Sequence, residues 1–141
     1  MVINVIGLDS TACIDYLNGR KAVKKLLEQH DEMVCITVIT IYEVNIGLER
    51  TKRKISEKRY KELNEKWLEF ISGMEILVMD SKEAVIAAEI HDNLKSKGTV
   101  IDDNDILIAS IFLSNNIPKI VTRNVKHFHN IDRLNVIGYT L

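Results

Sequence analysis

The chain has 141 residues, of which 46% are hydrophobic and 28% are charged, with six glycines and one proline. This composition is typical of a globular protein that can bury a core, and it excludes disordered, collagen-like and disulfide-dependent chains. The formal net charge is −1, from 19 Lys and Arg against 20 Asp and Glu, so there is no overall basic charge to attract a polyanion. A nucleic-acid function would therefore need local basic patches or a metal ion.

The sequence shows no sign of export or of a membrane anchor. No stretch approaches the roughly 18 uninterrupted apolar residues of a membrane span, and the N-terminus lacks the basic start and cleavage site of a signal peptide. Cys13 and Cys35 lie far apart in apolar stretches, so we expect both thiols to be reduced and buried, and paired zinc-binding cysteines are absent. These features predict a cytoplasmic protein without membrane association.

Short β-branched runs alternate with longer amphipathic segments along the chain. Strands are predicted at residues 2–8, 34–39, 76–79, 120–122 and 135–137, and helices at 10–20, 21–30, 40–53, 56–72, 81–97 and 103–115. The strand runs are apolar almost throughout, as is typical of strands covered on both faces. The order of elements predicts one α/β domain over residues 1–141, a three-layer α/β/α sandwich with a mainly parallel sheet of four to five strands.

One segment, residues 49–69, differs in composition from the rest of the chain. Thirteen of its 21 residues are charged, eight of them basic and five acidic, and its apolar residues recur at helical spacing. An ordinary helix with a solvated outer face accounts for this pattern. The alternative is a projecting basic helical hairpin that contacts RNA phosphates or a partner protein.

Polar residues follow the predicted strands at their carboxyl ends. Asp9 follows the first strand, Glu43 comes shortly after the second, and Thr122 and Asn124 close the fourth, while Asp105 begins the helix that leads into the fourth strand. Ligands of open parallel sheets bind at the carboxyl ends of the strands. We therefore expect the acidic side chains to gather at this edge of the sheet.

Helix capping is the alternative explanation for each acidic residue. Asp9 is suited to cap the first helix, Thr40 and Glu43 have the spacing of a capping box, and Asp102 and Asp105 have the same spacing. Capping alone does not require the acids to share one edge. Carboxylates that lie together repel each other unless a proton or a cation neutralises them, and Mg²⁺ or Mn²⁺ prefers such oxygen ligands. Together the acids predict a metal site.

Four short segments carry a family resemblance. They are Leu8–Ser10, Tyr42–Glu43, Asp105–Ser110, and Val121–Asn124 with His127–Phe128. In this order, and over almost the whole chain, they resemble the PIN-domain nucleases and most of all the VapC-type toxins of prokaryotic toxin–antitoxin pairs. The resemblance implies a Mg²⁺- or Mn²⁺-dependent endoribonuclease, the toxin of a type II pair, that forms a homodimer and binds a cognate antitoxin.

The resemblance also implies which residues act. Asp9, Glu43 and Asp105 match the metal-binding and catalytic carboxylates of the family. Many relatives carry a further acid where this chain has His127, so the fourth ligand and the number of metal ions stay open. The secondary candidates for that place are Asp102, Thr122 and Asn124. His127 and His129 are predicted in a loop, where histidines are more often surface residues than ligands.

The predicted reaction is metal-assisted hydrolysis of RNA phosphodiester bonds. The acids would hold the ion directly or through water, the ion would activate a bound water, and Glu43 or Asp102 would orient that water. An RNA-processing PIN nuclease and a catalytically silent PIN-like binding domain are the alternatives. A receiver-like regulatory domain is disfavoured, because Asp9 stands alone after the first strand and no lysine follows the fifth.

Overall fold

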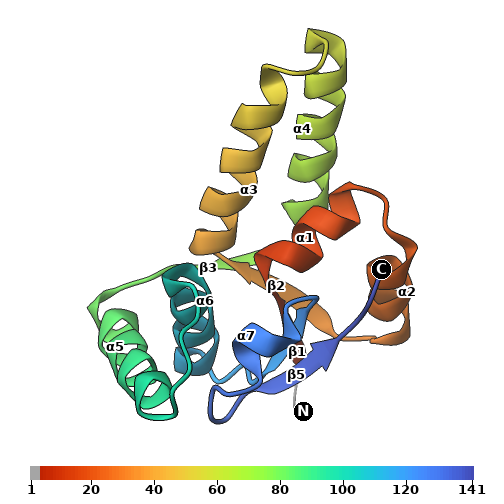
Figure 1. Ribbon diagram of the computed structural model, residues 1–141. Helices are drawn as coiled ribbons and strands as arrows, with labels where there is room; N and C mark the ends of the chain where they lie inside the picture. The colour runs from red at the N-terminus through yellow and green to blue at the C-terminus, as the bar shows by residue number, and fades with distance from the viewer. Residues whose placement is uncertain (1–3) are drawn as a thin grey trace.

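The computed structural model describes residues 4–141, which form a five-stranded parallel sheet covered by helices on both faces (Figure 1). The strands are β1 (Val5–Leu8), β2 (Met33–Thr37), β3 (Glu75–Leu77), β4 (Lys119–Thr122) and β5 (Asn135–Gly138). Their order across the sheet is β3-β2-β1-β4-β5, and every neighbouring pair is parallel. The predicted parallel sheet is confirmed, and residues 2 and 3 of the predicted first strand lie outside the described residues.

Seven helices lie within the described residues. They are α1 (Ser10–Leu17), α2 (Lys21–Gln29), α3 (Val38–Lys52), α4 (Glu57–Ile71), α5 (Ser81–Ser96), α6 (Asp103–Ser114) and α7 (Val125–Phe128). The six predicted helices are all present. The single turn α7 corrects the predicted loop around His127, and its N-cap Asn124 makes no side-chain capping hydrogen bond. None of the helices in residues 4–141 has both the length and the apolar character needed to cross a membrane.

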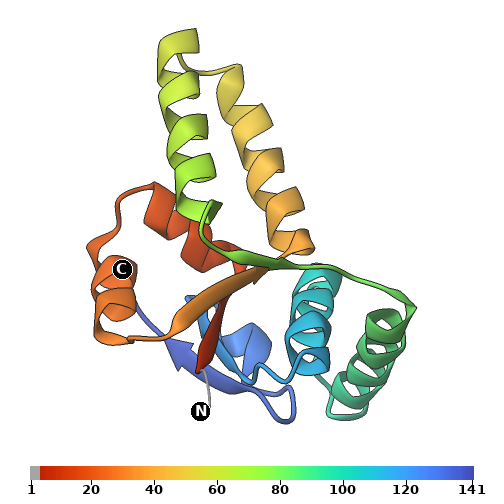
Figure 2. The ribbon, with the colours of Figure 1, turned by 180° about the vertical axis from the view of Figure 1, so that it is seen from behind.

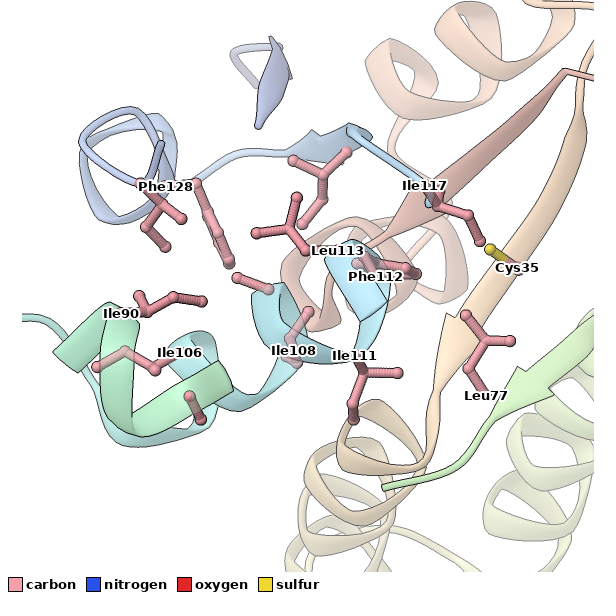
Figure 3. Close-up of a cluster of buried hydrophobic side chains, with 14 of the residues drawn as sticks. Cys35, Leu77, Ile90, Ile106, Ile108, Ile111, Phe112, Leu113, Ile117 and Phe128 are labelled. Atoms are coloured by element: carbon pink, nitrogen blue, oxygen red, sulfur yellow. The ribbon is translucent and has the colours of Figure 1, made fainter. Parts of the chain in front are cut away.

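The two faces of the sheet bury separate apolar clusters because side chains alternate along each strand. On β2, Cys35 joins one cluster and Ile36 the other, and on β4 the same holds for Ile120 and Val121. The first cluster packs against α5, α6 and α7, and Figure 3 shows its side chains. The second packs against α1 to α4. The three-layer arrangement is thus confirmed, as is the prediction that both free cysteines are buried.

A close contact between Gly7 and Phe112 seats α6 against the central strand. A Cβ atom at Gly7 would lie 2.5 Å from the Phe112 ring, so only glycine leaves room for this buried ring. Phe112 is a fully buried member of the first cluster (Figure 3). The contact fixes α6, whose first turn carries Asp105, against the strand that ends just before Asp9.

Helices α3 and α4 form a hairpin that projects away from the sheet (Figures 1 and 2). At its base Trp67 is only 1% exposed, and the ring of Phe70 stacks on that of Tyr16 from α1 with centroids 3.9 Å apart. The charged segment is therefore anchored at one end and reaches solvent at the other, as the hairpin hypothesis predicts. Contact of this hairpin with RNA or a partner stays a prediction.

Candidate active site

Asp9 lies at the point where β1 ends and α1 begins. It caps α1, because its Oδ1 accepts a hydrogen bond from the Ala12 amide at 3.0 Å. The capping explanation is therefore correct but incomplete, since Oδ2 accepts a hydrogen bond from the Thr122 hydroxyl at 2.6 Å. Thr11 donates to the same carboxylate, at 2.8 Å and 3.0 Å to its two oxygens. These bonds fix the carboxylate between two adjacent strands, β1 and β4.

Burial dominates the electrostatics of Asp9, whose exposed fraction is 1%. It raises the pKa of Asp9 from 3.8 to about 6, even though the hydrogen bonds from Thr122, Ala12 and Thr11 lower it. The negative charge of Asp105 adds a smaller increase to the same pKa. The repulsion between acids that the sequence predicts is therefore real here but smaller than the cost of burying one charge.

Asp105 lies in the first turn of α6 and is buried. Its Oδ2 is 2.6 Å from Nδ1 of His127, on α7. Burial raises the pKa of Asp105, and the hydrogen bond and charge of His127 oppose that increase. Asp102 caps α6 by accepting a hydrogen bond from the Asn104 amide at 3.3 Å, so the capping explanation holds for Asp102 and leaves the Asp105 carboxylate free for other contacts.

Glu43 lies on α3 and is half-buried. Its Oε1 accepts a hydrogen bond from the Ser10 hydroxyl at 2.7 Å, and that hydroxyl lies 3.0 Å from the hydroxyl of Thr40. The capping box expected at Thr40 and Glu43 is wrong, because α3 begins earlier and Thr37 is its N-cap, with the Thr40 amide as donor at 3.3 Å. Glu43 is thereby available to the site next to Asp9 instead of closing a helix end.

The secondary candidates have different surroundings. Thr122 is fully buried, and its hydroxyl donates to Asp9 and accepts from the Asn124 amide at 2.9 Å. Asn124 is half-buried at the start of α7. Asp102 is exposed. Thr122 therefore holds Asp9 in place, which gives it a positioning part in the candidate site.

The acids are linked without forming one compact cluster. Asp9 and Asp105 interact through space, and Glu43 is joined to the residue after Asp9 by the Ser10 hydroxyl. Across residues 4–141, no group of three or more His, Cys, Asp or Glu side chains is arranged to hold a metal ion. The donors near Asp9 are nevertheless hard oxygen atoms, which suit Mg²⁺ or Mn²⁺ with several retained waters. The donor chemistry therefore fits such an ion.

Comparison with known proteins identifies the class to which this fold and site belong. The sequence matches the PIN domain over residues 6–134. The chain therefore belongs to the PIN domain family, and the family predicted from its sequence is confirmed.

Within that family the chain is similar to VapC ribonucleases. It is 31% identical to the ribonuclease VapC of Rickettsia bellii, over 93% of this chain and 94% of the relative. It is 30% identical to ribonuclease VapC1 of Methanocaldococcus jannaschii, over 88% of this chain and 79% of the relative. The solved structure of VapBC2 from Rickettsia felis, bound to a DNA fragment from its promoter, superposes with a TM-score of 0.80 and 26% identity, covering 96% and 99% of the two chains.

Proposed function

We propose that this chain is the toxin endoribonuclease of a type II toxin–antitoxin pair, and that it hydrolyses RNA phosphodiester bonds with Mg²⁺ or Mn²⁺. The ribonuclease activity agrees with the names of the relatives, both of which are called ribonucleases, and the structural neighbour is a VapBC assembly. The observation that carries the proposal is the pair of buried carboxylates, Asp9 and Asp105, at the carboxyl edge of a parallel sheet. We propose that residues 1–141 form one nuclease domain.

The metal would be held by Asp9 and Asp105, with Glu43 as a ligand through water. In the absence of a cation, the ionisation of two buried carboxylates with raised pKa values lowers the stability of the fold. A divalent ion would offset that cost. When bound, such an ion lowers the pKa of a water molecule and stabilises charge on phosphoryl oxygens. Thr122 and Thr11 keep the Asp9 oxygens in place, and Ser10 holds Glu43 beside them.

The proposed partners are an RNA substrate, a cognate antitoxin and a second copy of the chain, all in the cytoplasm. The two projecting helices offer apolar side chains for such contacts, since Tyr42 is 61% exposed and Leu68 is 53% exposed. A silent binding domain is disfavoured, because burying two carboxylates costs stability that a cation bound in a working site would offset.

Cleavage of cellular RNA tests the proposed function. The protein, freed of any bound antitoxin by unfolding and refolding, is incubated with total RNA in Mg²⁺, in Mn²⁺ and in EDTA. We expect discrete fragments with either metal and intact RNA in EDTA. Mapping the fragment ends would identify the target. Intact RNA in all three samples, or the same fragments in EDTA, would contradict the proposed metal-dependent nuclease.

His127 is expected to support cleavage by holding Asp105. In His127→Ala the Oδ2 of Asp105 loses its partner, so we expect kcat to fall roughly 10- to 100-fold, as for residues that orient metal ligands. His127→Asn places an amide donor near the position of Nδ1 and should recover most of that loss. His129→Asn is the matched control, because His129 is exposed and its side chain makes no hydrogen bond among residues 4–141. Equal rates for the alanine and asparagine variants would refute this role.

A further inference from the structure

An open hollow of about 580 Å³ lies beside the candidate acids, between α7 and the end of β5. Its lining residues come from the segment after β4, including α7, and from the end of β5 with the two residues that follow it. They are Arg123, Asn124, Val125, Lys126, His127, Gly138, Tyr139 and Thr140. Three of these side chains are basic. Within the described part of the chain, none of the lining residues is acidic. The volume is in the range of pockets that bind small ligands.

A buried carboxylate outside the proposed metal site fixes two walls of this hollow. Asp15, on α1, is 3% exposed, and its Oδ2 accepts hydrogen bonds from Nε of Arg123 at 2.9 Å and from the Tyr139 hydroxyl at 2.6 Å. Burial, followed by the hydrogen bond to Asp15, holds the pKa of Tyr139 well above its usual range, so the phenol remains a donor. Asp15 thus fixes one cationic and one aromatic side chain at the rim of the same hollow.

The guanidinium of Arg123 is left with free donors. Asp15 uses only its Nε, and neither Nη nitrogen makes a hydrogen bond within residues 4–141. Arg123 is 43% exposed, so these donors reach solvent at the hollow. Lys126 is exposed and forms no ion pair with any described residue. Two cationic groups therefore face this space, and one of them is fixed in orientation before any ligand binds.

Hydrogen bonds link the backbone of Arg123, at the hollow, to the candidate active site. The Arg123 amide donates to the Thr11 hydroxyl at 3.1 Å, and that hydroxyl donates to the Asp9 carboxylate. The preceding residue, Thr122, also donates to Asp9. A ligand bound by Arg123 would therefore lie close to the acids without competing with them for a ligand position.

We propose that this hollow binds a phosphate of the RNA chain next to the bond that is cleaved, with Arg123 and Lys126 as its cationic ligands. The inference rests on the proposed ribonuclease function. A guanidinium presents paired donors that match phosphate geometry, and the ammonium of a lysine adds a second charge. Asp15 acts as a positioning residue, because it orients Arg123 and does not itself face the RNA.

Two variants separate phosphate binding from a purely structural use of Arg123. Lys126→Ala removes a charge that has no partner in the described structure, so folding should be unaffected. Arg123→Gln removes the second charge, while its amide nitrogen stands as many bonds from the backbone as Nε and can still donate to Asp15. Lys95→Ala is the matched control, because Lys95 is exposed on α5, on the outer side of α6 (Figure 1). Thermal unfolding of each variant reports any structural effect separately.

Equilibrium binding of a fluorescein-labelled, single-stranded RNA of mixed sequence tests the proposal in EDTA, where the proposed cleavage is stopped. We expect affinity to fall roughly threefold in Lys126→Ala and roughly tenfold in Arg123→Gln, and to be unchanged in Lys95→Ala. The slope of log K against log salt should become shallower by about 0.7 for each phosphate that the variant no longer binds. Adenosine 5′-monophosphate should compete weakly.

Four results would overturn the proposal. The first is that both variants keep the affinity and salt slope of the wild type, and the second is that the wild type shows no saturable RNA binding. The third is that Arg123→Gln lowers the melting temperature but leaves RNA affinity unchanged. The fourth is that the mononucleotide binds as tightly as the RNA. Failure of the proposed function would look different. A wild-type protein that binds this RNA in EDTA but cleaves no RNA with Mn²⁺ refutes the nuclease, whereas the two variants still decide the phosphate site.

Discussion

Replacing Asp9 with asparagine is expected to reduce RNA cleavage by more than about 100-fold while the fold is kept. Asparagine has the same shape: its oxygen, at the position of Oδ1, can accept the hydrogen bond of the Ala12 amide, and its amide nitrogen, at the position of Oδ2, can donate to the Thr122 hydroxyl. It lacks the negative charge that would hold a divalent ion. Initial cleavage rates at saturating Mn²⁺, compared with the wild type, measure the loss.

The matched control for this variant is Asp102→Asn. Asp102 is also an acid that caps a helix, at the start of α6, but it is exposed, and asparagine is an equally good cap. We expect Asp102→Asn to cleave RNA at close to the wild-type rate. An active Asp9→Asn with normal circular dichroism, or an inactive Asp102→Asn, would mean that the metal site is wrongly placed.

The position of the candidate acids was predictable because the sequence constrains them strongly. Runs of β-branched residues predict strands, and strands separated by helices form parallel sheets whose carboxyl ends lie at one edge. Asp9 directly follows one such run, so its place at that edge depends only on the topology. Asp105 is harder to place, because it is carried by a helix, and the contact between Gly7 and Phe112 sets the position of that helix.

The contacts that hold these acids in place and shift their pKa values were not predictable from the sequence. Thr122 meets Asp9 across 113 positions of sequence, and His127 meets Asp105 across 22, so no local pattern pairs them. The capping-box spacing of Thr40 and Glu43 was misleading, because a tertiary hydrogen bond from Ser10 engages Glu43 instead. The single turn that carries His127 has no side-chain cap and is shorter than any reliable helical periodicity.

The buried charge of Asp9 should also be visible in the stability of the metal-free protein. Its pKa is about 6 when folded, against an ordinary value of 3.8, so ionisation of this group opposes folding. The contribution of Asp9 to stability is therefore fully present below about pH 4 and is lost as the pH rises through about 6. A difference of about two pKa units corresponds to roughly 3 kcal/mol at pH 8.

In EDTA at pH 8 we therefore expect Asp9→Asn to be more stable than the wild type by about 2–3 kcal/mol, with the gap closing near pH 4. Urea unfolding of both proteins at the two pH values measures this difference. Asp105 is present in both, so only its interaction with the Asp9 charge differs between them. Adding Mn²⁺ at pH 8 should stabilise the wild type and not the variant. A gap of the same size at both pH values would show that the asparagine acts by packing rather than by charge. If the gap closes near pH 4 and Mn²⁺ stabilises only the wild type, the negative charge of Asp9 both binds the ion and lowers the stability of the metal-free fold.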